Sequence, residues 1–177
     1  MDPVSDELTD AVADREKPSC EGFGELGVHL TCILIDEALL QINVLELDGC
    51  GPELVEELCD YVNEHWAEPA NAIHLASYVM WRLNWIHPFA DGNGRTSRIT
   101  SYVVLSIRAG YVLPGTPTIP DQIVDNRTPY FDALDAAYIA YSEGRIDVSK
   151  MEELIGGLLA KQLTTFYAAA GGSETAN

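Results

Sequence analysis

The stretch HPFADGNGRTSR, residues 87–98, brings four chemically capable side chains close together in the sequence: His87, Asp91, Arg95 and Arg98. An imidazole that is neutral near pH 7 can accept a proton from a reacting hydroxyl group. A carboxylate suits Mg²⁺, and guanidinium groups bind phosphate oxygens through paired hydrogen bonds. The carboxylate and the two guanidinium groups therefore indicate the binding of a phosphate-rich nucleotide.

Two glycines in the same stretch indicate that the main chain also takes part. Gly92 and Gly94 permit positive φ angles and the close approach of a ligand to the backbone. The amide groups of Gly92, Asn93 and Gly94 are expected at the N-terminus of the following helix, where unpaired N–H groups form an anion site. Arg95 and Arg98 lie on one face of that helix, where each opposes the helix dipole by up to about 1 kcal/mol. A bound phosphate group would offset that penalty.

Common phosphate-binding and metal-binding motifs do not account for the stretch. It contains neither the G-x-x-x-x-G-K-[ST] nor the G-x-G-x-x-G pattern of nucleotide-binding loops. A calcium loop beginning at Asp91 would need Glu at its last ligand position, where Tyr102 stands. The histidines of the chain lack the spacing of a zinc site. The structural alternative is an ordinary turn at residues 91–94 beside a His87 that is buried in the core.

Helices predicted on both sides of this stretch would hold it in place. Residues 52–66 repeat apolar side chains at helical spacing. The segment 71–86 is mostly apolar on all sides and is predicted to be a central, buried helix. It must end near the residue before Pro88, where helical geometry is disfavoured. A further helix is expected over about 94–109, closed by Gly110.

The rest of the chain is also predicted to be mostly helical. Residues 121–144 are interpreted as helical pieces broken near Pro129. A last helix is expected to open with a capping box formed by Ser149 and Glu152. Residues 40–47 suit a short strand or hairpin, although an apolar core segment explains them equally well. The expected fold class is therefore all-α, a helical bundle with one small β element. The last helix should bury Met151, Leu154, Ile155, Leu158 and Leu163.

The composition fits one soluble, acidic domain. The chain has 177 residues, a net charge of −18 and no apolar run of the roughly 18 residues that a membrane span needs. Nucleic acid is a poor partner for such a surface. Residues 1–22 are expected to be an acidic flexible tail, residues 23–170 one domain and residues 171–177 a flexible C-terminal tail. Because no signal-peptide pattern is present, a cytoplasmic location without a membrane partner is expected.

The stretch resembles the motif H-x-F-x-[DE]-G-N-G-R-x-x-R of the Fic (Fic/Doc) family, with agreement at all eight defining positions from His87 to Arg98. The similarity extends more loosely over about residues 40–165. The resemblance implies a Fic-type helical bundle with a β-hairpin flap before the motif. It also implies transfer of AMP from ATP to a Ser, Thr or Tyr hydroxyl group of a target protein. Gly94 favours AMP, because relatives that act as kinases carry Lys at that position.

The same resemblance implies roles for the first residues of the motif. His87 would be the general base that takes the proton from the target hydroxyl group. Phe89 would be an inward anchor of the loop without a chemical role. Asp91 would hold Mg²⁺ against the α- and β-phosphates. The adenine contacts are not assigned, although Tyr130 and Phe131 lie in a region that could approach the base.

The remaining motif residues are implied to bind the phosphates of ATP. Gly92, Asn93 and Gly94 would form the anion hole, with Asn93 assisting at the α-phosphate. Arg95 would meet the β-phosphate, and Arg98 the γ-phosphate. Since attack at the α-phosphorus releases pyrophosphate, these groups would act chiefly by positioning and by neutralising charge.

Partners and regulation are less well defined. The target would bind as an added strand on the flap near residues 40–47. Many relatives carry an inhibitory helix with the motif [ST]-x-x-x-E-[GN], but Lys17 and Ile139 stand where the two candidate segments would need Ser or Thr. A separate inhibitor protein is therefore one expectation. Two alternatives stay open: a non-catalytic module that binds a nucleotide or a partner, and a Fic enzyme that transfers another phosphate-containing group.

Overall fold

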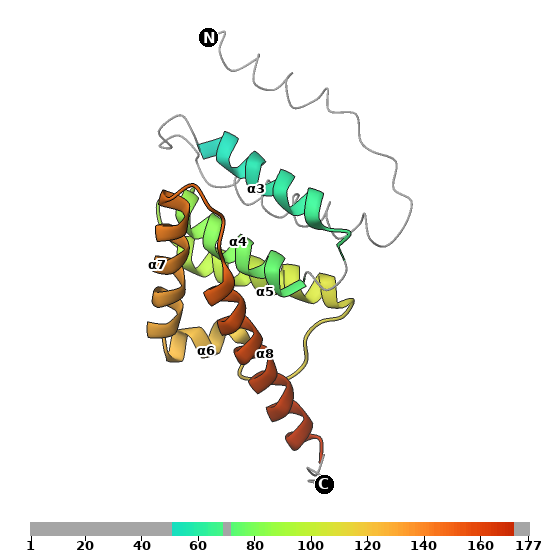
Figure 1. The fold of residues 1–177 in the computed structure, drawn as a ribbon. Helices are drawn as coiled ribbons and strands as arrows, with labels where there is room; N and C mark the ends of the chain where they lie inside the picture. Colours follow the sequence, from blue (N-terminus) through green and yellow to red (C-terminus); the bar gives the residue numbers. More distant parts are fainter. Residues whose placement is uncertain (1–50, 69–71, 172–177) are drawn as a thin grey trace, which may run out of the picture.

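The structure of the chain is a computed structural model that describes residues 51–68 and 72–171. Within these ranges every regular element is a helix, so the predicted all-α class is confirmed for them (Figure 1). The hairpin predicted near residues 40–47 lies outside the described ranges. The helices are α3 (Gly51–His65), α4 (Ala72–Ile86), α5 (Asn93–Ala109), α6 (Ile119–Asp125), α7 (Thr128–Ser142) and α8 (Ser149–Ala169).

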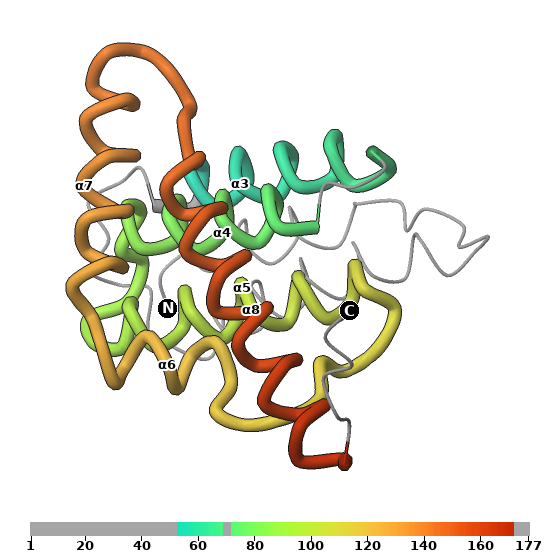
Figure 2. The backbone as a smooth tube through the Cα atoms, turned by 60° about the horizontal axis from the view of Figure 1, so that its bottom comes forward, coloured from blue at the N-terminus to red at the C-terminus, as the bar shows by residue number. Residues whose placement is uncertain are grey.

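Helix α4 lies at the centre of the fold. It packs mainly against α5 and also contacts α3, α7 and α8 (Figure 2). All residues from 75 to 83 are buried, which confirms the central helix predicted over 71–86. A helix that is enclosed on several sides needs apolar residues around its whole circumference. None of the helices in the described part of the chain combines the length and the apolarity needed to cross a bilayer.

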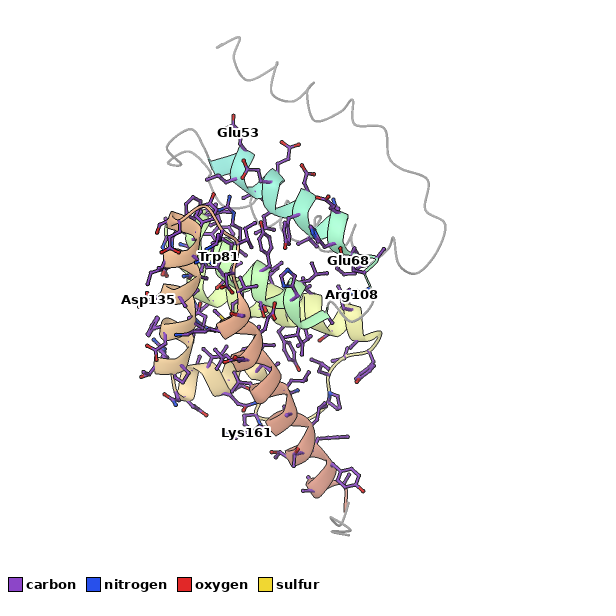
Figure 3. The ribbon with its side chains drawn as sticks, viewed as in Figure 1. Glu53, Glu68, Trp81, Arg108, Asp135 and Lys161 are labelled. Carbon is purple, nitrogen blue, oxygen red and sulfur yellow. The ribbon has the colours of Figure 1, made fainter. Side chains whose placement is uncertain are left out.

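One charged side chain, Arg82, is buried within α4. Its guanidinium carbon lies 4.5 Å from the ring centroid of Trp85 and 4.9 Å from that of Tyr141, so aromatic faces replace part of its hydration. Its Nη2 donates to the carboxylate of Glu57 at 3.0 Å. The preceding residue, Trp81, lies inside the bundle (Figure 3). Arg82 therefore joins α3, α4 and α7 at the C-terminal end of α4.

The helix boundaries near the motif agree with the sequence predictions. Helix α4 ends at Ile86, two residues before Pro88, and α5 begins directly after Gly92. Gly92 and Gly110 flank α5 with left-handed φ angles of 87° and 80°. Such angles are readily adopted by glycine because it has no Cβ atom. The predicted glycine cap of α5 is thus confirmed.

The capping box predicted at Ser149 and Glu152 is wrong. Val148 is the residue before the first turn of α8, and it makes no side-chain cap. The main-chain N–H and the hydroxyl group of Ser149 both donate to Oδ1 of Asp147, at 3.1 and 2.7 Å. The carboxylate of Glu152 instead accepts a hydrogen bond from Nδ1 of His74 at 2.6 Å. A tertiary contact has therefore replaced the local one.

The described chain contains a capping box at the start of α6. The main-chain N–H of Asp121 donates to Oγ1 of Thr118, and the N–H of Thr118 donates to the Asp121 carboxylate at 3.0 Å. The hydrogen bonds from Thr118 lower the pKa of the Asp121 carboxyl group. Two residues separate the end of α6 from the start of α7, which carries Pro129 in its first turn. The break predicted near Pro129 is therefore confirmed.

A polar chain joins three helices on the other side of α4. The hydroxyl group of Tyr61 in α3 lies 2.9 Å from Nε2 of His74 in α4. Nδ1 of the same imidazole lies 2.6 Å from the Glu152 carboxylate in α8. Burial and the neighbouring carboxylates raise the pKa of Tyr61, so its phenol stays protonated. The ring of Tyr61 also stacks on Tyr78, with centroids 3.7 Å apart.

We expect the fold to lose stability at alkaline pH because of its buried tyrosines. Burial raises the pKa of Tyr78 from 10.0 to about 12, and burial also raises the pKa of Tyr138. The folded state therefore keeps protons that the unfolded state releases above pH 10. The free energy of unfolding should be unaffected by these groups below pH 10 and should decrease as the pH rises from 10 to about 12.

Denaturant unfolding on both sides of pH 10 measures this effect. In a Tyr78→Phe variant the alkaline decrease should be smaller, because the phenol that titrates is gone. Tyr111, which is 57% exposed, provides the matched control, and Tyr111→Phe should keep the full decrease. The explanation fails if Tyr78→Phe and the unmodified chain lose stability equally with pH.

Candidate functional site

The loop between α4 and α5 presents His87 at the surface. His87 has a φ angle of 56°, and it is the one non-glycine residue with positive φ in the described ranges. Its main-chain N–H donates to the carbonyl oxygen of Leu83 at 3.2 Å, and its Nδ1 lies 3.2 Å from the carbonyl oxygen of Asn84. A carbonyl oxygen only accepts, so Nδ1 carries the proton of the neutral ring. The lone pair is then on Nε2, which suits a general base.

The side chain of Asn93 closes the loop from the inside. Its Oδ1 accepts the main-chain N–H of Phe89 at 2.8 Å, and its Nδ2 donates to the carbonyl oxygen of the same residue. Phe89 is 4% exposed, as expected for an inward anchor, and Asn93 is 3% exposed. The carboxamide of Asn93 is thus used within the protein. Its main-chain N–H donates to no acceptor within the described part of the chain.

The first amide groups of α5 are available to an anion. The N–H groups of Arg95 and Thr96 both donate to the carbonyl oxygen of Gly92 at 2.9 Å. Within the described part of the chain the N–H groups of Gly92, Asn93 and Gly94 donate to no acceptor. These are the amides for which the sequence predicts an anion site. The helix dipole adds a favourable potential at the same place.

The two arginines of the motif are held in different ways. Nη2 of Arg95 lies 2.9 Å from Oδ2 of Asp91, and both side chains are largely exposed, at 70% and 91%. The guanidinium carbon of Arg98 lies 5.9 Å from the ring centroid of Tyr130. Its Nη1 lies 3.2 Å from the point that a Cβ atom on Gly94 would occupy. Gly94 therefore makes room for Arg98, in addition to exposing its amide.

Two residues outside the motif support the loop, and the sequence did not single out these supporting roles. Asn84, in α4, provides the carbonyl oxygen that Nδ1 of His87 contacts. Its Nδ2 donates to the hydroxyl group of Tyr138 in α7 at 2.9 Å. Tyr130, considered for adenine, is 3% exposed and lies against Arg98, while Phe131 is 52% exposed. The one local signal for Asn84 is its place four residues before a proline.

The residues present fit a metal ion that is bound mainly by a nucleotide. No cluster of three or more His, Cys, Asp or Glu side chains that could hold a metal occurs within 51–68 and 72–171. Asp91 is a single, exposed carboxylate beside the free amides of α5. Mg²⁺ commonly uses one or two carboxylates together with phosphate oxygens and water. A site made by Asp91 and bound phosphates meets that pattern.

Comparisons with known proteins point to one family. Residues 37–105 match the model of the Fic/DOC family, a range that contains α3, α4 and the whole of residues 87–98. The chain is 47% identical over 53 residues to the protein adenylyltransferase Fic of Drosophila mojavensis and to that of Drosophila grimshawi. Each match covers 27% of this chain, and 10% and 11% of those relatives.

A longer match is less similar. Over 104 residues the chain is 29% identical to protein adenylyltransferase fic-1 of Caenorhabditis briggsae, which covers 55% of this chain and 18% of the relative. The matches therefore span about a tenth to a fifth of the length of these relatives.

Proposed function

We propose that this chain transfers AMP from ATP to a hydroxyl group of a target protein, a proposal supported by the match of residues 37–105 to the model of the Fic/DOC family. Pyrophosphate is the other product. The observation that carries the proposal is one short loop with an exposed imidazole, free Nε2, and unpaired helix amides flanked by two guanidinium groups. The names of the relatives support transfer of an adenylyl group.

In the proposed reaction His87 removes the proton from the attacking hydroxyl group. Its Nδ1–H stays hydrogen-bonded to the carbonyl oxygen of Asn84, so the lone pair of Nε2 accepts the new proton. The hydroxyl oxygen forms a bond to the α-phosphorus, and the bond between that phosphorus and the oxygen bridging to the β-phosphate breaks. Assistance of this kind by a positioned base contributes typically about 10²–10⁴-fold to the rate.

The proposed phosphate contacts come from the start of α5. The N–H groups of Gly92, Asn93 and Gly94 would bind the phosphates, with Arg95 at the β-phosphate and Arg98 at the γ-phosphate. Mg²⁺, when bound, neutralises part of the phosphate charge, and Asp91 would hold it. Arg95 must leave Asp91 to meet a phosphate, but an exposed ion pair is worth only about 0–1 kcal/mol.

We expect Gly94→Ala to weaken the binding of Mg²⁺-ATP by about three- to tenfold, the size of one weakened hydrogen bond of about 0.5–1.5 kcal/mol. The new methyl group would lie 3.2 Å from Nη1 of Arg98, so the guanidinium group must move. Isothermal titration calorimetry measures the change. The matched control is Gly157→Ala in α8, where no neighbouring atom lies within 4 Å and the affinity should stay the same. Equal affinities for both variants would contradict the proposal that Gly94 leaves room for the guanidinium group of Arg98 at the phosphate site.

The decisive experiment follows AMP itself. The chain is incubated with ATP labelled on its α-phosphate, with Mg²⁺ and a mixture of candidate proteins. A covalently labelled protein, heavier by one AMP group in its mass spectrum, supports the proposal. Label that appears only from ATP carrying the isotope on its γ-phosphate would point to phosphate transfer instead. Nucleotide binding without any labelled product would favour a binding module.

A further inference from the structure

Pro88 leaves a main-chain acceptor without its usual partner. In a helix the carbonyl oxygen of residue 84 accepts the N–H of residue 88, but proline has no N–H group. That oxygen, on Asn84, is instead contacted by Nδ1 of His87 at 3.2 Å. The imidazole therefore takes the place that an amide group would occupy. The last regular helical bond is the one from the N–H of His87 to Leu83 at 3.2 Å.

Pro88 also restricts the backbone of His87. A residue before proline is sterically disfavoured in the α-helical region. His87 leaves the helix with a φ angle of 56°, a left-handed conformation that costs a side-chain-bearing residue free energy. Such a conformation persists only when its surroundings impose it. On the other side of His87, Pro88 and Phe89 are buried and Asn93 holds Phe89 at both main-chain polar groups.

We propose that Pro88 is a positioning residue for His87: by withholding an N–H group and by excluding the helical conformation of His87, it reserves the Asn84 carbonyl oxygen for the imidazole. The reserved bond places the ring proton on Nδ1 and leaves Nε2 able to accept the proton of a substrate. This inference deepens the proposed AMP transfer and rests on it for its meaning in catalysis. Its structural content, the ring tautomer and the backbone conformation, does not depend on activity.

Replacement of Pro88 by alanine tests the inference. The alanine would offer an N–H group and would allow α4 to continue through His87, so that the amide takes over the Asn84 carbonyl oxygen. Nitrogen-15 spectra of the imidazole should show a protonated Nδ1 in the unmodified chain and a mixture of both tautomers in Pro88→Ala. The Cα and Cβ shifts of His87 should move toward helical values. A His87→Gln spectrum assigns the ring signals.

The matched control is Pro120→Ala, which changes a proline in the first turn of α6. A proline there deprives no carbonyl oxygen of its donor, since the first N–H groups of a helix have no intrahelical partner. The tautomer and the backbone shifts of His87 should be unchanged in this variant. If AMP transfer is found, kcat should decrease about two- to tenfold in Pro88→Ala, the effect of one misplaced hydrogen bond, with an unchanged Kd for ATP.

Two results overturn the inference. One is a neutral His87 that carries its proton on Nε2 in the unmodified chain, a measurement that needs no variant to fold. The other is a folded Pro88→Ala chain, verified by circular dichroism, whose ring tautomer and His87 shifts are the same as before. Absence of AMP transfer in the unmodified chain would contradict the proposed function alone, because both spectroscopic results would stand without it.

Discussion

His87→Ala should lower the rate of AMP transfer by about 10²–10⁴-fold, the usual contribution of a positioned general base. The side chain is exposed, and its side-chain hydrogen bond within the described chain is the contact between Nδ1 and the Asn84 carbonyl oxygen. Its removal takes away one exposed contact of the Asn84 carbonyl oxygen and no core packing, so it should hardly change the free energy of unfolding. The affinity for Mg²⁺-ATP should also be retained, because the phosphate contacts come from α5.

Three measurements separate these effects: the transfer of labelled AMP, the calorimetric Kd for ATP, and the urea midpoint. His65→Ala in α3 is the matched control, since His65 lies outside the loop that carries His87 and contacts the carbonyl oxygen of Tyr61. It should transfer AMP at the rate of the unmodified chain. An enzyme that stays active as His87→Ala would remove the imidazole from the mechanism and leave only the phosphate site.

Gln162→Leu should give the largest loss of stability, about 3 kcal/mol or more. Gln162 is completely buried in α8. Its Oε1 accepts the N–H of Ile119 at 3.0 Å, and its Nε2 donates to the hydroxyl group of Tyr102 at 2.9 Å and to the carbonyl oxygen of Pro114 at 3.0 Å. Leucine of similar size would fill the space but would leave the buried N–H of Ile119 without its acceptor and the Pro114 carbonyl oxygen without this donor, at about 1–3 kcal/mol each. The Tyr102 hydroxyl group would keep its bond to the Leu113 carbonyl oxygen.

Urea unfolding gives the change in the free energy of unfolding. Thr165→Ala is the control on the same helix, because its exposed hydroxyl group donates only to the carbonyl oxygen of Lys161. That variant should differ from the unmodified chain by less than about 0.5 kcal/mol. A Gln162→Leu loss that is no larger than the control value would mean that water replaces the amide at this position.

The sequence predicted the parts of the fold that strong local signals determine. Proline indicated the end of α4 through its backbone restriction, and glycine indicated the cap of α5 through its tolerance of left-handed φ angles. Both effects act whatever surrounds the residue. The apolar character of residues 71–86 predicted burial, because a helix that is apolar on all sides must be enclosed on several of them. The site residues were identified from their types and spacing together with the resemblance to the Fic motif, and their proposed roles still await the experiments above.

Tertiary contacts explain what the sequence could not predict. Glu152 matched a capping pattern, but a partner 78 residues away along the chain, His74, takes its carboxylate. In α8 the helical pattern favoured Leu163 for the core, whereas the neighbouring Gln162 is the buried residue because its amide has partners in the chain at 114–119. Arg82 belongs to a helix predicted from its apolar residues, and only the arrangement of the surrounding rings accounts for its burial.

The motif did not reveal what the side chain of Asn93 contacts. The side chain of Asn93 binds the main chain of Phe89. The expectation that Asn93 assists at the α-phosphate stays a prediction, and it now concerns the main-chain N–H of this residue. A sequence states which residue stands at a position, but it does not distinguish an amide that meets a ligand from one that shapes the loop. That distinction depends on χ angles, which only coordinates reveal.

The hydrogen bonds within residues 83–96 connect residues at most four positions apart, from the contact of His87 with Leu83 to that of Arg95 with Asp91. The bond of Asn84 to Tyr138 is a separate, long-range support. Closing such short stretches of chain by hydrogen bonds costs little conformational entropy. The loop can therefore assemble as soon as α4 and α5 pair, early and fast, before distant parts of the chain arrive. It could equally open and reclose as a small unit while the rest of the molecule stays folded.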